Sequence, residues 1–293
     1  MSGARLSRAD AAGCGAIGLW AFLAVLGRGA SAIPPLELVG LSFAVSGLLG
    51  LIALAVSRRL GALRQPPLAW LHGVAGLFLY HAFYFAALAR APAAAVNLIN
   101  YLWPLLIVVL AGPMLGLRLT LVQWVGTGLA LVGCATLLGT GAPFPQGAAL
   151  GYALAAGAAL TWALYSILAR RFTAVPLGAM AGFCAMTSLL ALMMHVWTET
   201  TVTPGVADWA VILALGLGPL GVAFLLWDWG MKRGDPRLLG TLAFATPVLS
   251  TLLLGATGQV EITMTVLLAA GLVAAGGLLA ARASPDRPRS SVG

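Results

Sequence analysis

The sequence predicts an all-α integral membrane protein with ten transmembrane helices, arranged as two inverted five-helix repeats. Three observations lead to this fold class: an apolar composition, a chain-long series of apolar runs, and an internal similarity at a fixed offset. Of the 293 residues, 61% are hydrophobic and only 8% are charged, whereas soluble domains carry roughly 25% charged residues. Because a membrane-spanning helix needs about 20 apolar residues, the chain has room for roughly ten such helices and short loops.

Apolar runs separated by glycine, proline or charged residues set the predicted spans in each half of the chain. In the first repeat, residues 1–145, they fall at 11–29, 36–57, 68–89, 93–112 and 120–140. In the second repeat, residues 146–282, they fall at 148–169, 176–197, 208–231, 237–256 and 261–281. Residues 283–293 are rich in proline, serine and arginine, so we expect a disordered cytoplasmic tail there.

The positions of the basic residues predict the orientation of the spans. With the N-terminus in the cytoplasm, only Arg28 and Arg90 of the 16 Lys and Arg residues fall in outside loops. This positive-inside bias predicts cytoplasmic N- and C-termini and an even number of spans. It also accounts for the net charge of +8, so we expect the lipid bilayer as a partner and not nucleic acid.

The two halves of the chain resemble each other. At an offset of 143 residues the matches are Tyr101 with Phe244, Pro104 with Pro247, Gly112 with Gly255, Thr120 with Thr263, Gly128 with Gly271, and Gly133 with Gly276. Because each copy holds five spans, an odd number, the second copy must enter the membrane from the opposite side. Equivalent loops exchange charge accordingly, since Arg118 is matched by Glu261.

The first span also belongs to this repeat. Arg5 and Arg8, an apolar run and the tripeptide Ala30-Ser31-Ala32 together imitate a cleaved secretory signal. At an offset of 142, however, Trp20 and Arg28 match Trp162 and Arg170. We therefore expect a retained helix equivalent to span six.

Inverted repeats favour a secondary transporter that works by alternating access. No GxxxxGK[ST] loop occurs, so ATP hydrolysis is not expected. Asp228 lies four residues before Lys232 and is expected to pair with it, which leaves no mid-span carboxylate to couple ions. Facilitated or substrate-gradient-driven movement is the simplest remaining mechanism. A duplicated scaffold or receptor that does not transport is the alternative from another class.

Polar and aromatic residues at mid-membrane mark the predicted substrate site, because lipid-facing helices avoid them. The candidate substrate-binding residues are Tyr80, His81 and Tyr84 in span three, Asn97, Asn100, Tyr101 and Trp103 in span four, Trp20 in span one, and Trp162 and Tyr165 in span six. Interhelical bonding is an equally good explanation for the amides alone, and core packing for the tryptophans. Pro104 and Pro247 interrupt spans four and nine and are predicted hinges.

Other chemistries are disfavoured. Cys14, Cys134 and Cys184 lie in apolar runs without metal-ligand spacing, so no metal and no cofactor are expected. An intramembrane enzyme would need a nucleophile next to a base, yet no GxSxG motif occurs and His81 has no carboxylate on a neighbouring face. We expect a non-enzymatic protein that acts as a monomer.

The segment Asn100-Tyr101-Leu102-Trp103-Pro104, with ten spans, an antiparallel repeat and prolines in spans four and nine, resembles the EamA family of the drug/metabolite transporter (DMT) superfamily. The pentapeptide itself resembles the span-four motif of the YddG-type aromatic amino-acid exporters. The resemblance implies export of aromatic and other neutral amino acids across a bacterial inner membrane, from a cavity lined by spans one, three, four, six, eight and nine. A carrier of another amphipathic neutral metabolite or drug remains the alternative.

Overall fold

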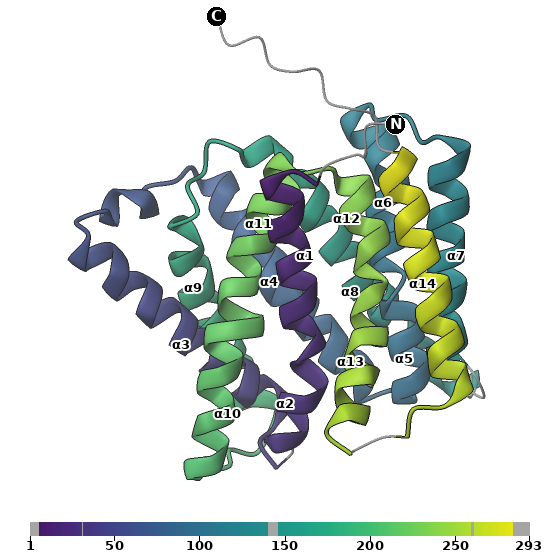
Figure 1. Ribbon diagram of the computed structural model, residues 1–293. Coiled ribbons are helices and arrows are strands. Elements are labelled where there is room, and N and C mark those ends of the chain that lie inside the picture. Colours follow the sequence, from purple (N-terminus) through teal and green to yellow (C-terminus); the bar gives the residue numbers. More distant parts are fainter. Residues whose placement is uncertain (1–5, 31, 140–145, 259–260, 284–293) are drawn as a thin grey trace, which may run out of the picture.

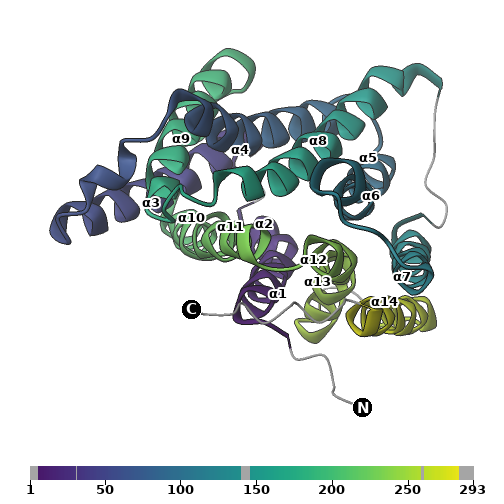
Figure 2. The ribbon, with the colours of Figure 1, turned by 90° about the horizontal axis from the view of Figure 1, so that it is seen from above.

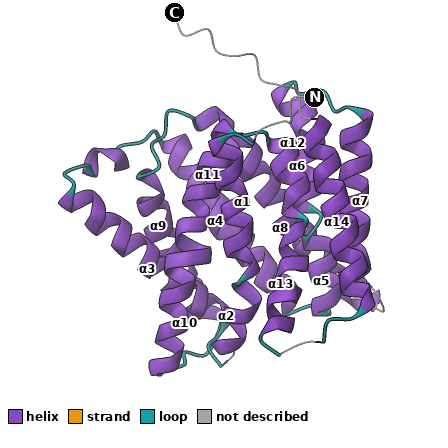
Figure 3. Ribbon diagram, in the orientation of Figure 1, coloured by secondary structure: helices purple, strands orange, loops and turns teal. Residues whose placement is uncertain are grey.

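Every regular element in the described part of the chain is a helix (Figures 1 and 3). The computed structural model describes residues 6–30, 32–139, 146–258 and 261–283. Residues 284–293, nearly all of the predicted tail, lie outside the described residues, as does Ser31 of the signal-like tripeptide.

The helices follow the predicted spans closely. The first half contains α1 (Arg8–Ala21), α2 (Leu23–Gly29), α3 (Pro35–Val56), α4 (Pro67–Leu88), α5 (Ala93–Asn100), α6 (Trp103–Leu115) and α7 (Leu121–Gly139). The second half contains α8 (Ala149–Leu168), α9 (Ala179–Thr198), α10 (Val206–Leu217), α11 (Ala223–Arg233), α12 (Pro236–Ala243), α13 (Ala245–Ala256) and α14 (Met264–Ala283). Short turns are the 3₁₀ elements η1 (Leu60–Leu63), η2 (Gln146–Ala148) and η3 (Ala169–Phe172) and the π-helical turn η4 (Gly218–Val222).

These helices confirm the prediction of an all-α membrane protein. Among the described residues, nine helical segments are long and apolar enough to cross a membrane, and a shorter apolar helix covers Leu121–Leu137. Their outward faces are apolar, as a bilayer requires: Leu121, Val196 and Leu68 are all largely exposed.

Spans four and nine are broken at matching places. α5 ends at Asn100 and α12 ends at Ala243, each four residues before a proline, Pro104 or Pro247. A proline has no N–H to donate to the carbonyl four residues earlier, and its ring crowds that carbonyl. The break therefore follows directly from the sequence at both positions.

Span eight is broken in a different way. α10 and α11 are joined by η4, a single π-helical turn that contains Pro219. Within this turn the Pro219 carbonyl oxygen accepts a hydrogen bond from the indole N–H of Trp20, at 3.0 Å. Single π turns inside α-helices are frequent at functional sites.

Close helix pairs form the two edges of the molecule, α3 with α9 at one edge and α7 with α14 at the other (Figure 2). In both pairs glycines bring the backbones together. A Cβ at Gly126 of α7 would lie 2.7 Å from the Gly276 carbonyl oxygen of α14, and one at Gly133 would lie 2.9 Å from that of Ala269. Small residues permit such backbone contact inside membranes.

The two ends of the bundle differ. We call the end where α1 begins and α14 finishes the near end, at the top of Figure 1, and the opposite end the far end. At the near end α6 packs closely on α12, where a Cβ at Gly240 would lie 3.0 Å from the Pro104 carbonyl oxygen. At the far end α5 and α13, which are fully within the described ranges, have almost no contact. The broken spans therefore meet at the near end and separate at the far end.

Candidate functional site

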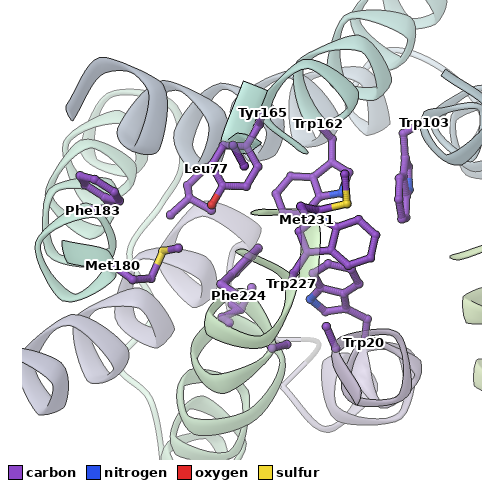
Figure 4. Packing of buried hydrophobic residues seen from close by; sticks show 14 of the residues in the cluster. Trp20, Leu77, Trp103, Trp162, Tyr165, Met180, Phe183, Phe224, Trp227 and Met231 are labelled. Carbon is purple, nitrogen blue, oxygen red and sulfur yellow. The ribbon is translucent and has the colours of Figure 1, made fainter. Parts of the chain in front are cut away.

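Four tryptophans from four spans meet in the middle of the bundle. This tryptophan cluster consists of Trp20 of α1, Trp103 of α6, Trp162 of α8 and Trp227 of α11 (Figure 4). The ring centroids of Trp20 lie 5.1 Å from Trp227, 5.5 Å from Trp162 and 6.3 Å from Trp103. Such edge-to-face and tilted arrangements suit the ring quadrupoles.

Hydrogen bonds fix the orientation of two of these rings. The Trp227 indole N–H donates to Ser166 Oγ at 2.9 Å, and the Trp20 indole N–H donates to the Pro219 carbonyl noted above. All four side chains are buried. The four packed rings, two of them fixed through their indole N–H groups, form a rigid aromatic wall.

Phe224, Phe43 and His81 extend this wall. Phe224 lies 5.5 Å from Trp162 and stacks on Phe43 at 5.6 Å. His81 meets Phe43 edge-on at 5.3 Å, and its Nδ1 lies 2.7 Å from the Leu77 carbonyl oxygen of the same helix. His81 therefore has both a ring partner and a backbone partner, which is the arrangement of a packing residue.

A row of tyrosines and asparagines lies beside the cluster between α4 and α5. We call Tyr80, Tyr84, Asn97 and Asn100 the polar ladder. The Tyr84 hydroxyl donates to Asn97 Oδ1 at 2.6 Å, and the Asn100 amide donates to the Tyr80 hydroxyl at 3.3 Å. The two tyrosine rings are parallel with centroids 6.1 Å apart, and Tyr80 also lies 5.2 Å from Trp162.

The ladder leaves one buried polar atom without a partner among the described residues. Asn100 is buried, and its Oδ1 makes no hydrogen bond with any described residue. An unsatisfied buried acceptor costs about 1–3 kcal/mol, so it is a place where a ligand donor would be stabilised. Tyr80, Tyr84 and Asn97 are only partly buried.

Tyr165 and Tyr101 lie at the borders of this region. Tyr165 packs against Trp162 at 5.1 Å and against Gly76, filling the contact between α8 and α4. Tyr101 packs against a separate apolar cluster that includes Phe244 and Val248. The structure thus brings eight of the ten predicted site residues together in the cluster, its wall and the ladder, with Tyr165 at the edge and Tyr101 on a second cluster.

Sequence reasoning missed Trp227 and Phe224. The repeat contains a signal that points to both, because at the offset of 143 Trp227 matches Tyr84 and Phe224 matches His81. The predicted pairing of Asp228 with Lys232 is confirmed at 2.7 Å. Among the described residues, no group of three or more His, Cys, Asp or Glu side chains is placed to hold a metal ion.

An open groove between α4 and α8 lies apart from the ladder. Apolar side chains such as Leu68, Leu71 and Leu164 line it, with Arg171 at one end. Because its walls are the apolar outer faces of two spans, the groove has the character of a lipid-facing surface.

Comparison with known proteins agrees with this architecture. A family model described as "EamA-like transporter family" matches residues 7–139 and again residues 149–282. A crystal structure with 43% sequence identity superposes with a TM-score of 0.90 and covers 94% of this chain and 98% of the other.

Named relatives come from several bacteria. The aromatic amino acid exporter YddG of Ancylobacter novellus is 43% identical over 278 residues, which is 94% of this chain and 97% of the relative. The protein of the same name from Escherichia coli strain K12 is 26% identical and covers 90% and 93% of the two chains. A Streptantibioticus cattleyicolor protein named "Probable terminal-alkyne amino-acid exporter" is 27% identical over 73% of this chain and 76% of the relative. Because the family model matches both halves of the chain, this chain belongs to the EamA-like transporter family.

Proposed function

We propose that this protein exports aromatic and other neutral amino acids across the bacterial inner membrane. The observation that carries the proposal is the meeting of an aromatic wall with the polar ladder at mid-membrane. The relative from Ancylobacter novellus, named as an aromatic amino acid exporter, supports it.

The two parts of the site suit the two ends of such a substrate. Tyr80, Trp162 and Trp103 offer ring faces and edges on which an aromatic side chain can stack. The unpartnered Asn100 Oδ1 is an acceptor for the substrate ammonium. The carbonyl of Asn100, which loses its helical donor at Pro104, is a second acceptor. Neutral groups suffice here because a zwitterion carries no net charge.

Two inverted repeats, residues 1–145 and 146–282, explain the helix contacts. At the offset of 143, Gly126 corresponds to Ala269 and Gly133 to Gly276. The contact of Gly126 with Gly276 and that of Gly133 with Ala269 are therefore the same contact seen from the two repeats. Such reciprocity is expected of a pseudo-two-fold axis in the membrane plane.

The orientation follows from charge. Arg118, Arg170, Arg233 and Arg237 lie in or against the turn between α11 and α12, which contacts Asp10 at the start of α1 and is therefore at the near end. The positive-inside bias makes that end cytoplasmic, together with both chain termini. Closure of α6 on α12 then seals the cytoplasmic side, whereas the separation of α5 from α13 opens the site outward. During transport the contact between α6 and α12 opens and a contact between α5 and α13 forms, and Pro104 and Pro247 are the hinges.

Substrate movement needs no ion in this scheme. Asp228 is paired with Lys232, and the ladder is composed of uncharged groups. Transport is therefore facilitated or driven by the substrate gradient, and one chain acting as a monomer contains the whole pathway.

A second substrate class is another amphipathic amino acid or neutral metabolite. The relative named for a terminal-alkyne amino acid favours this reading, because it shows similarity over 73% of this chain. An alkyne has a π system and would also lie well against tryptophan faces.

Counterflow in proteoliposomes tests the proposal. We expect vesicles loaded with unlabelled phenylalanine to accumulate labelled phenylalanine transiently, with competition by tryptophan and tyrosine and none by glutamate or lysine. Binding of phenylalanine without any counterflow would instead indicate a receptor or scaffold. Stronger competition by an alkynyl amino acid than by phenylalanine would favour the second class.

A further inference from the structure

Three cationic side chains at the near end each donate to a main-chain carbonyl across the closed contact. Arg170 Nη1 lies 2.7 Å from the Gly234 oxygen, Lys232 Nζ lies 3.1 Å from that of Val175, and Arg237 Nη1 lies 2.8 Å from that of Arg118. Arg118, Arg170 and Val175 belong to the side formed by α6, η3 and the start of α9. Lys232, Gly234 and Arg237 belong to the side formed by α11 and α12.

Two of these cations, Lys232 and Arg237, are held in place by carboxylates on their own side. Both carboxylate oxygens of Asp235 accept from the Arg237 guanidinium, at 2.8 and 3.1 Å. Asp228 holds Lys232, and Asp10 Oδ1 accepts the Asp235 N–H at 2.7 Å. Lys232 and Arg237 are more than nine-tenths buried. Charge-assisted hydrogen bonds of this kind are about twice as strong as neutral ones.

The corresponding turn at the far end has different chemistry. At the offset of 143, Asp235 matches Pro92, which has no N–H, and Arg237 matches Ala94. Lys232 matches Ala89, and the adjacent cation, Arg90, donates to the Ala86 carbonyl of its own helix at 3.0 Å. Of the three cations only Arg170 has a cationic counterpart, Arg28, at the offset of 142 that relates the first and sixth spans.

We propose that Arg170, Lys232 and Arg237 form the cytoplasmic gate, and that releasing their three carbonyl contacts is the step that opens the site inward. These are positioning residues, because they act through the main chain and not on the substrate. The inference rests on the alternating-access function proposed above. In the described part of the corresponding far-end turn, the cation Arg90 bonds only within its own helix and does not tie the two sides together, so the substrate-free protein rests open to the outside.

Spin-label distances in detergent and in liposomes, without substrate, test the gate. In a background lacking Cys14, Cys134 and Cys184, one label pair at Arg8 and Thr173 spans the near end, and a second at Ala93 and Thr257 spans the far end. For the double variant R170Q/R237Q we expect a new population with a longer near-end and a shorter far-end distance. Removing one charge-assisted bond shifts the equilibrium by about tenfold or more, so the double variant has a large inward-open fraction.

The chain offers matched controls. Arg171 is the exposed neighbour of Arg170, so R171Q leaves both distances unchanged. Arg118 contributes only its main-chain carbonyl to the contact, so R118A also leaves both distances unchanged. The conservative variant R170K keeps the parental near-end distance, because lysine can also donate to the Gly234 carbonyl. Unchanged distances in R170Q/R237Q, or equal changes in R171Q, would overturn the gate. Because no substrate is present, a shift in distance supports the gate even where phenylalanine counterflow fails.

Discussion

Spans four and nine share a break but differ in what surrounds it. Both lose their helical pattern four residues before a proline. Around the break, however, Asn97 of span four corresponds to Gly240 of span nine, and Trp103 corresponds to Thr246. Span four therefore supplies amide and indole groups, while span nine supplies the small surface on which α6 packs. In the proposed mechanism, one copy serves recognition and the other closure.

In the proposed alternating-access scheme, this difference means that the two ends close in different ways. Gly240 lets α12 come to the Pro104 carbonyl with no side chain between them. At the far end the equivalent position is Asn97, whose amide is already bonded to Tyr84. We expect the far end to close over a substrate that lies against the ladder. We do not expect a direct backbone contact there like the one between α6 and α12.

The largest effect should come from a side chain added at Gly240. In G240V the new atoms would collide with Val108, Ile107 and the Pro104 carbonyl, where even a Cβ would lie 2.9 to 3.0 Å away. Overpacking of this kind costs about 1–3 kcal/mol, so we expect phenylalanine flux to fall by about tenfold or more. The control is G271V on α14, where a Cβ meets nothing within 4 Å. An equal loss of flux in G240V and G271V would contradict a closure that depends on Gly240.

A smaller effect is expected from the amide of Asn100. N100L keeps the bulk but removes the bond to Tyr80 and the free acceptor. A lost polar contact costs roughly 1 kcal/mol or somewhat more, so the KM for phenylalanine should rise by about tenfold with little change in kcat. Y84F, which removes only a hydroxyl, serves for comparison, and a KM shift larger in Y84F than in N100L would contradict the assignment.

Substitutions of Trp103 and Tyr101 test which of the two clusters beside the span-four break contacts the substrate. W103F weakens contacts with Trp20 and Trp227, and aromatic pairs contribute about 0.5–1.5 kcal/mol each. We expect a several-fold rise in KM, measured by concentration-dependent uptake. Y101F removes a hydroxyl from the side chain on the second cluster and should change KM less; the reverse order would place Tyr101 in the substrate site.

The prolines should give the smallest change. In P104A or P247A an N–H becomes available and the helix can continue through the break. We expect turnover to slow by about two- to fivefold with KM nearly unchanged, because hinges affect opening and closing more than binding. Parental turnover in both variants would show that the breaks do not act as hinges.

The spans and their proline breaks were predictable because each follows from local chemistry. Apolar runs of sufficient length must be helical in a bilayer. Pro104 and Pro247 interrupt their helices through local backbone chemistry, which does not depend on the neighbouring helices. The π-helical turn at Gly218–Val222 was not predictable, since its residues continue an apolar run. Its role depends on Trp20, 199 residues away in sequence.

The residue types of the candidate site were predictable from the sequence, but their grouping was not. Tyr80, Asn100 and Trp162 stood out because polar and aromatic residues are costly at mid-span. Trp227 lies near a charged helix end in sequence, which makes it look like an interfacial residue, yet packing buries it completely. The contacts of the proposed gate could not be predicted from the sequence either, because their acceptors are backbone carbonyls that any residue could supply.

The glycine contacts between α7 and α14 have a consequence for the history of the chain. Reciprocal contacts between equivalent positions are what an isologous interface between two identical subunits has. The proposed inverted repeat thus implies a five-helix ancestor that assembled as an antiparallel homodimer along the α7–α14 contact. Residues 1–145 and 146–293, co-expressed as separate polypeptides, should then find each other in the membrane and assemble without the covalent connection.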